Sequence, residues 1–397
     1  MSAANDDLAL PRGFRDILPT EARELHAIER TLMEAFERYG YVPLEPPSVE
    51  FARAASTVDE RRMMRFLDQG NLLALRPDVT TALARVVAQR YREAQGALRL
   101  SYFTTVFRQD RSMRGSEREY DQAGVELIGP TGAVADAEIL ALLCDALTSL
   151  GLRSFTIEVG HMGAVRALFA DLPAATVETV LERLRGSDLV GAFRVAADAG
   201  MPADRLEHAR RTLAVRGRGI EALGDLACVR DLRETIHLAR ELFAGDPPLG
   251  VPDLGVIPAL PYYTGIVFEV VSPHVGAPIA TGGRYDELLA RYGTDRAATG
   301  FGIAVPLLHQ ALVADGWKVS FDAPLVSLEG GDDAVRLRVA AALRGRGFAV
   351  ALGGVAESAG RAIVRAEVVS AERVRIDGRE LPLDAAAREL SQAGPNR

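Results

Sequence analysis

The sequence predicts an α+β fold in which mainly antiparallel strands are flanked by helices. Stretches rich in β-branched and aromatic residues follow one another across short polar loops, as in 63–75 and 101–128. Between 164 and 245 the pattern is almost wholly helical, with segments that end at prolines and glycines. The chain has no Walker loop and no GxGxxG after a strand, so P-loop and dinucleotide-binding folds are not favoured.

The composition is that of an ordinary globular protein. The chain has 397 residues, of which 48% are hydrophobic and 25% charged, and is long enough for two or three domains. No apolar run approaches the roughly 20 residues that span a bilayer, and the N-terminus lacks the features of a secretory signal. We therefore expect a cytoplasmic protein without a membrane partner.

Neither cysteines nor histidines indicate a metal site. Cys144 and Cys228 lie in helix-like, largely apolar stretches, which favours buried free thiols over a disulfide. His161 and His274 have no partner at ligand spacing, so structural or surface roles are expected for them. The net charge of −8 does not favour a chain that holds a large RNA through its own surface, although a local basic patch stays possible.

The N-terminal third should alternate helices with short strands. Thr20 can cap a helix whose apolar residues recur at helical spacing until Gly40. The following segment, 41–51, contains three prolines and is expected to be an edge strand or an interface segment. Two strands, at 63–67 and 71–75, should then pair across a tight turn.

Asp78 lies at a strand-to-helix corner, directly before a helix expected from Thr81 to about Gln95. A carboxylate in this position can cap the helix or contact a ligand, and from the local pattern alone the cap is favoured.

The central stretch of the chain is 101–129. Its two strands, 101–108 and 122–128, are joined by a loop rich in arginine and acidic residues. Strand alternation places Gln122, Gly124 and Glu126 on one face, where the glycine removes bulk between two polar side chains. The pattern fits the floor of a site for a small cationic, hydrogen-bonding ligand, and it fits an ordinary solvated hairpin equally well.

The rest of the sequence is expected to form further strands, a helical module and a small α/β segment. Strands are expected at 254–257, 262–271, 277–281 and 299–305, with a helix opening at Gly282 and running to about Tyr292. From Asp322 onward strands and helices alternate again. The predicted organisation is a core in two parts with an insertion and a C-terminal domain: 1–163, 164–248 (the helical insertion), 249–320 (the second part of the core) and 321–397 (the α/β domain).

Four separated stretches give the chain a specific resemblance to histidyl-tRNA synthetases over about residues 8–315. They are RGFRDILP at 12–19, LRPD at 75–78, the hairpin at 107–129, and YYTGIVFE at 262–269 with GGRYD at 282–286. The resemblance implies a class II aminoacyl-tRNA synthetase-like antiparallel sheet flanked by helices. It also implies a homodimer formed near Pro47.

The chain departs from this family where the family binds ATP. Pro258 and Pro261 stand in the segment where a synthetase would carry an arginine and an aspartate, and Leu307 stands where the third class II motif would place an arginine. In the loop after Arg108, Asp110 stands where the synthetases have the longer glutamate, and Ser116 stands where they have an arginine. Leucine and proline cannot donate a side-chain hydrogen bond to a phosphoryl oxygen, and loss of one such donor costs on the order of 10²- to 10³-fold in rate. Aminoacylation is not expected.

The amino-acid side of the pocket is kept. By resemblance, Asp78, Thr80 and Gln122 match the groups around a histidine ammonium, Glu126 and Tyr263 match those around the imidazole, and Arg108 faces the carboxylate. The histidine-binding set implied is Asp78, Thr80, Arg108, Gln122, Glu126, Tyr262 and Tyr263. Carboxylates suit an ammonium and a guanidinium suits a carboxylate, so each match is chemically sensible.

A synthetase-like core with a histidine pocket but without ATP chemistry resembles the regulatory subunits of ATP phosphoribosyltransferase. That resemblance implies a non-catalytic chain without cofactors. Its implied partner is a short catalytic subunit, with which it performs the first step of histidine biosynthesis and relays feedback inhibition by histidine. The short C-terminal segment fits poorly as an anticodon-binding domain, so tRNA binding is not favoured. The alternatives are a divergent but active histidyl-tRNA synthetase, a free-standing histidine sensor, and a synthetase-like enzyme with another acceptor.

Overall fold

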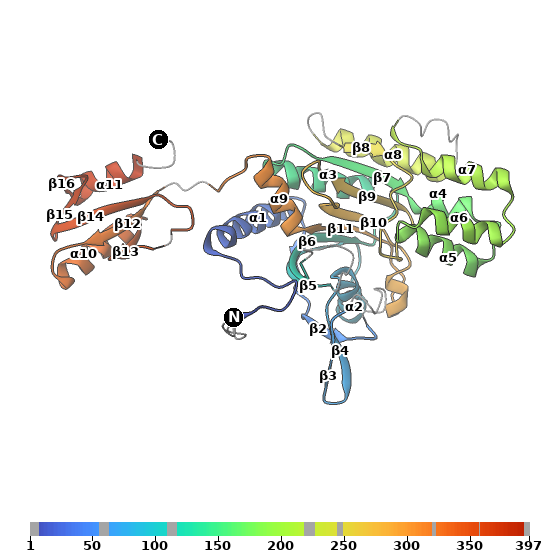
Figure 1. Ribbon diagram of the computed structural model, residues 1–397, viewed down its shortest axis with the longest axis horizontal. Helices are drawn as coiled ribbons and strands as arrows, with labels where there is room; N and C mark the ends of the chain where they lie inside the picture. The colour runs from blue at the N-terminus through green and yellow to red at the C-terminus, as the bar shows by residue number, and fades with distance from the viewer. Residues whose placement is uncertain are drawn as a thin grey trace, which may run out of the picture. The chain divides into compact units, whose positions relative to one another are not determined.

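The computed structural model describes residues 8–54, 63–108, 117–217, 227–243, 249–319, 323–356 and 358–392. Asp110 and Ser116 lie outside these ranges. The chain forms two compact units, one of residues 1–15 and 28–317 and the other of residues 16–27 and 318–397 (Figure 1). None of the helices in the described ranges is long and apolar enough to cross a membrane.

An eight-stranded sheet forms the centre of the first unit. Its strand order is β1-β5-β6-β11-β10-β9-β7-β8, and all pairs are antiparallel except β1 with β5 and β7 with β8 at the two edges. The predicted α+β class with a mainly antiparallel sheet is therefore confirmed. The strands are β1 (Val42–Pro43), β5 (Leu98–Phe107), β6 (Glu119–Ile128), β7 (Thr156–His161), β8 (Leu249–Pro252), β9 (Ile266–Val271), β10 (Ala280–Arg284) and β11 (Ala298–Ala304).

The central hairpin is the longest pairing in this sheet. Strands β5 and β6 pair in register from Leu98 opposite Ile128 to Phe107 opposite Glu119. On its other side, β6 pairs with β11, a strand that contains two glycines. The hairpin thus pairs with a strand that lies about 170 residues later in the chain, and side chains of β6 and β11 share one surface of the sheet.

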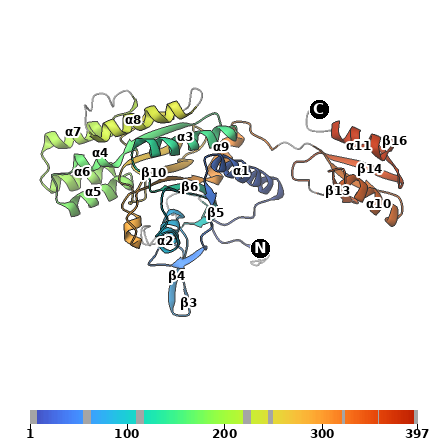
Figure 2. The same cartoon turned by 180° about the vertical axis from the view of Figure 1, so that it is seen from behind.

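Helices cover this sheet, and the region after β7 is helical, as expected. The helices α2 (Thr80–Arg90), α3 (Ala133–Ser149) and α9 (Val305–Ala314) flank the strands, together with the part of α1 (Pro19–Arg38) from Ile28 onward, which belongs to this unit. Between β7 and β8 lie α4 (Met162–Leu168), α5 (Ala174–Arg185), α6 (Leu189–Asp198), α7 (Ala203–Leu213) and α8 (Ala227–Leu242). Helix α3 is buried along most of its length and lies beside α8 in both views (Figures 1 and 2).

A three-stranded sheet precedes the corner that carries Asp78. It has the order β2-β4-β3, formed by β2 (Val49–Phe51), β3 (Arg65–Asp68) and β4 (Asn71–Leu75). Arg76 follows β4, is buried, and donates from Nε to the carbonyl oxygen of Thr105 on β5 at 2.8 Å. This contact fixes the corner that carries Asp78 against the central hairpin.

The second unit contains a five-stranded sheet with two helices. The order is β13-β12-β14-β15-β16, and apolar residues of the strands form a core with those of α10 and α11. The elements are β12 (Leu325–Glu329), α10 (Asp333–Arg344), β13 (Ala349–Leu352), β14 (Ile363–Ser370), β15 (Arg373–Ile376), β16 (Arg379–Pro382) and α11 (Leu383–Gln392).

Several local predictions were wrong. Thr20, expected to cap the first helix, lies inside α1, which begins at Pro19. The helix expected from Gly282 is instead the end of β10, and only a short 3₁₀ helix, η4 (Leu289–Tyr292), follows it. The two glycines pair with β9 and β11 on either side, and a Cβ at Gly283 would collide with the backbone of β9. Segment 254–257 is not a strand, because the chain pairs with β7 earlier, through β8.

Candidate functional site

All seven residues of the predicted set line one cavity of about 210 Å³ in the first unit. They come from the start of α2, from the hairpin β5–β6 and from the segment before β9. The lining is Asp78, Thr80, Arg108, Gln122, Glu126, Pro258, Ala259, Leu260, Tyr262, Tyr263, Glu269, Pro278, Thr281, Tyr285, Gly300, Phe301 and Gly302.

Strand β6 supplies the floor of this cavity. Gln122, Gly124 and Glu126 alternate along it and lie opposite Ala304, Gly302 and Gly300 of β11. A Cβ at Gly300 would overlap Glu126 Oε2, and one at Gly302 would overlap Gln122 Nε2. The glycines therefore leave the space into which the two polar side chains of β6 extend.

Glu126 is the most constrained polar group of the site. Its side chain is buried, accepts a hydrogen bond from Thr80 Oγ1 at 2.6 Å and accepts another from the Tyr285 hydroxyl. Burial raises its pKa to about 8, against the opposing effect of the two hydroxyl donors. A cationic or N–H-donating ligand would favour the ionised carboxylate here.

Asp78 both caps the helix and lines the cavity. Its Oδ2 accepts a hydrogen bond from the backbone N–H of Thr81 at 3.1 Å, and the side chain is buried. Burial raises its pKa, while the charge of Arg108 and the backbone donors of α2 lower it. The two roles left open by the sequence are therefore compatible.

Arg108 and Gln122 offer further hydrogen-bonding groups. Arg108 donates from Nε to the carbonyl oxygen of Pro77 at 2.8 Å, which holds its guanidinium beside the cavity. Gln122 donates from Nε2 to the hydroxyl of Tyr102 at 3.1 Å, whereas its buried Oε1 has no protein partner among the described residues. An unpaired buried amide oxygen is costly, and a ligand donor would satisfy it.

Three tyrosines form an aromatic wall. The ring centroids of Tyr262 and Tyr263 are 4.8 Å apart, and that of Tyr285 lies 5.4 Å from Tyr262 and 6.3 Å from Tyr263. Tyr285 was not among the predicted site residues; its segment was expected to be a helix, whereas it directly follows the end of β10.

Glu269 was also missed, although it stands in the YYTGIVFE stretch. Burial raises its pKa to about 7, with the nearby carboxylates of Glu158 and Asp253 adding to the shift. Glu158 lies directly opposite it on β7. The cavity therefore carries three carboxyl groups, and Arg108 is the one cation among its described lining residues.

Pro258 and Leu307, which stand where a synthetase would have ATP-binding residues, contribute no phosphate-binding group to the cavity. Pro258 lines the cavity wall. Leu307 lies in the first turn of α9, half-buried and outside the cavity lining. No arginine reaches the cavity from either position.

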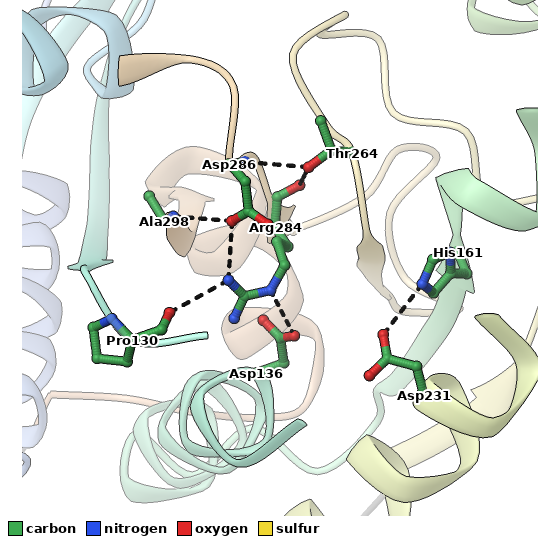
Figure 3. Close-up of polar contacts among 8 residues, drawn as sticks. All are labelled: Pro130, Asp136, His161, Asp231, Thr264, Arg284, Asp286 and Ala298. Atoms are coloured by element: carbon green, nitrogen blue, oxygen red, sulfur yellow. Dashed lines mark hydrogen bonds and ion pairs between the residues drawn. The ribbon is translucent and has the colours of Figure 1, made fainter. Parts of the chain in front are cut away.

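A second polar cluster lies beside the wall (Figure 3). Arg284 on β10 pairs from Nε with Asp136 of α3 at 2.9 Å and from Nη1 with Asp286 at 3.0 Å. Nearby, His161 accepts from the Gly163 N–H at Nδ1 and so donates from Nε2 to Asp231 of α8, at 3.2 Å. His161 thus caps α4 and ties β7 to α8, and His274 lies 3.2 Å from Asp315.

The comparisons with known proteins find two kinds of relative, histidyl-tRNA synthetases and regulatory subunits of ATP phosphoribosyltransferase. The family model for histidyl-tRNA synthetase matches residues 13–308. A Moorella thermoacetica protein named ATP phosphoribosyltransferase regulatory subunit is 37% identical over 385 residues, covering 92% of this chain and 97% of its own length. A protein of the same name from Symbiobacterium thermophilum is 35% identical and covers 86% of this chain and 90% of its own.

Solved structures show the same fold. The crystal structure of a Bacillus halodurans C protein, described as an ATP phosphoribosyltransferase regulatory subunit/histidyl-tRNA synthetase, matches with a TM-score of 0.77 at 28% identity, covering 91% of this chain and 99% of its own. Histidyl-tRNA synthetase from Nostoc sp. PCC 7120 matches with a TM-score of 0.78 at 19% identity, covering 97% and 99%. The predicted class II synthetase-like fold is confirmed.

Proposed function

The chain belongs to the family of ATP phosphoribosyltransferase regulatory subunits, and we propose that it serves there by binding histidine in the cavity over β6. It is a non-catalytic subunit that acts in histidine biosynthesis with a catalytic ATP phosphoribosyltransferase chain. The proposal concerns the ligand, the residues that hold it and the inhibition that its binding relays.

The observation that carries the proposal is the match between the cavity and histidine. A small enclosed space brings together two buried carboxyl groups, Asp78 and Glu126, one guanidinium, Arg108, and the unpaired Oε1 of Gln122. A free amino acid has an ammonium, a carboxylate and, for histidine, two ring nitrogens, which these groups complement. An analogue lacking one nitrogen would lose the hydrogen bond to the buried group that meets that nitrogen, so the arrangement would select histidine.

Histidyl adenylation is disfavoured by the same cavity. The transition state of adenylation spreads negative charge over phosphoryl oxygens, which fixed cations must offset. Arg108 is the one cation among the described lining residues, and three carboxyl groups share the space with it. Pro258 and Leu307 supply no donor that could join Arg108 in offsetting the charge of a triphosphate.

Three further features belong to this proposal. The chain forms a homodimer through its synthetase-like core, near Pro47, and joins a short-form catalytic subunit in the cytoplasm. It does not depend on tRNA, consistent with its net charge of −8. Histidine inhibits the complex by binding more tightly to one state of it than to another, since coupling is only as large as that difference in affinity.

Titration calorimetry of the purified chain with histidine tests the proposal. Wild-type protein should bind histidine, and Glu126→Ala should weaken binding strongly, because it strands Thr80 and Tyr285 hydroxyls beside the ligand. An absence of binding at millimolar histidine would refute it. A synthetase-like rate of adenylate formation from ATP and histidine would favour an active histidyl-tRNA synthetase instead.

A further inference from the structure

The aromatic wall of the cavity is held from behind by one buried guanidinium. Arg284 is the last residue of β10, is 6% exposed, and immediately precedes Tyr285. Its side chain extends toward Asp136 of α3 and the carbonyl oxygen of Pro130 (Figure 3). It does not line the cavity itself.

The backbone of Arg284 joins the two segments that carry the tyrosines. Its carbonyl oxygen accepts the N–H of Thr264, the residue after Tyr263, at 2.8 Å. The hydroxyl of Thr264 in turn accepts the N–H of Asp286, the residue after Tyr285, at 3.1 Å. Tyr263 and Tyr285 therefore each lie one residue from a hydrogen bond that ties their segments together.

The side chain of Arg284 fixes this junction to the rest of the fold. The guanidinium pairs with Asp136 of α3 and with Asp286, whose Oδ1 also accepts the N–H of Ala298 on β11 at 3.2 Å. Gly265 allows the arginine stem to pass, because a Cβ there would stand 3.1 Å from Arg284 Cδ. The guanidinium on β10 thus binds α3 directly, through Asp136, and β11 indirectly, through Asp286.

A buried ion pair of this kind is weak support for stability. Removing the Arg284 and Asp136 charges from water is expensive, and well-packed apolar residues often stabilise a fold as well. What the pair does supply is geometry, since a planar guanidinium binds two acceptors in fixed directions. Arg284 directly precedes Tyr285, whose hydroxyl donates to Glu126 in the cavity. The ion pair is therefore placed to hold the orientation of Tyr285.

We propose that Arg284, with Asp136 and Thr264, is a positioning residue for histidine recognition, which orients the Tyr263–Tyr285 wall without touching the ligand. This inference rests on the proposed function. Displacement of the wall would move the Tyr285 hydroxyl away from Glu126 and alter the group that meets the imidazole.

Arg284→Lys is the direct test, and Arg99→Lys is its matched control. Arg99 also ties a strand of the sheet to α3, through Glu138 at 2.9 Å, but lies outside the cavity and its wall. A lysine at either position keeps the charge and loses the fork. Histidine affinity is measured by calorimetry and thermal stability by scanning calorimetry, on the full-length chain.

We expect Arg284→Lys to raise the Kd for histidine by about 10-fold or more, while Arg99→Lys stays within about 2-fold of wild type even if both lower the Tm. In a double-mutant cycle, Arg284→Lys and Tyr285→Phe should be less than additive on affinity, because the first acts through the second. A role in stability alone would not produce that coupling.

Thr264→Val provides a second test if Arg284→Lys fails to fold. It removes the acceptor for the Asp286 N–H in a half-buried, nearly isosteric change, and should also weaken histidine binding. Wild-type affinity in Arg284→Lys or, where that variant is unfolded, in Thr264→Val overturns the positioning role. Failure of the wild-type chain to bind histidine overturns the proposed function instead.

Discussion

Gly300 of β11 lies directly opposite Glu126 of β6, and the carboxylate occupies the space that a side chain at position 300 would fill. Two residues along, Gly302 lies opposite Gly124, and the space that a side chain at position 302 would fill is occupied by the amide of Gln122. The polar floor of the cavity thus depends on glycines contributed by another strand. A buried carboxylate and a buried amide can face a ligand here because their neighbours have no side chain.

Gly300→Ala should therefore abolish or greatly weaken histidine binding. The added methyl group overlaps the Glu126 carboxylate, which must leave its contacts with Thr80 and Tyr285, and it also overlaps the carbonyl oxygen of Val125, which strains the pairing of β11 with β6. We expect the Kd to rise by at least about 10-fold in calorimetry. Gly276→Ala is the control, since a Cβ there meets nothing within 4 Å. Equal affinity in the two variants would contradict the account of the floor.

Histidine binding should release protons between about pH 6 and 8. Burial raises the pKa of Glu126 to about 8 in the empty cavity, and a ligand that donates to the carboxylate lowers it again. Affinity should thus increase as the pH rises toward 8. Calorimetry in buffers of different ionisation enthalpy measures the release, which Glu126→Gln should remove. A release of the same size in that variant would mean that a group other than Glu126 loses the proton.

The same carboxyl group should make stability depend on pH. Its pKa in the folded protein is raised above the ordinary value of 4.5, so its contribution is fully present below about pH 4.5 and is lost as the pH rises through about 8. Relative to wild type, Glu126→Gln should gain in Tm between pH 5 and pH 9 in the absence of histidine. Parallel Tm curves for the two proteins would show that Glu126 does not titrate in this range.

Tyr285→Phe should weaken histidine binding without unfolding the chain. It removes one of the two hydroxyl donors to Glu126, and a hydrogen bond to a charged group contributes about 1.5–3 kcal/mol. We expect the Kd measured by calorimetry to rise roughly 10-fold or more. Tyr292→Phe is the control, because the Tyr292 hydroxyl donates to the carbonyl oxygen of Ala54 and lies outside the cavity; an equal loss in both variants would argue against a specific role for Tyr285.

The sequence predicted the parts of this site that depend on local order. The hairpin that carries Gln122 and Glu126 follows from strand alternation and turn residues, and the predicted histidine-binding set was assembled from motifs. The structure brings all seven of its members to one cavity.

What the sequence missed depends on pairing between distant segments. Arg284 and Asp136 are 148 residues apart, and neither pattern nor propensity indicates that they meet. The helix expected at Gly282 was overridden by pairing of β10 with strands on both sides, which placed Tyr285 at a strand end facing Glu126. The role of the glycines of β11, which leave space for Gln122 and Glu126, follows only from the register of β11 with β6.

The most direct test of the central claim is a phosphoribosyltransferase assay on the complex of this chain with its short catalytic subunit, with and without histidine. The account predicts that the wild-type chain supports activity that histidine inhibits, and that Tyr285→Phe supports activity that histidine inhibits only at roughly 10-fold higher concentration or more. Inhibition of the Tyr285→Phe complex at the wild-type histidine concentration would contradict the claim that histidine acts through the cavity over β6.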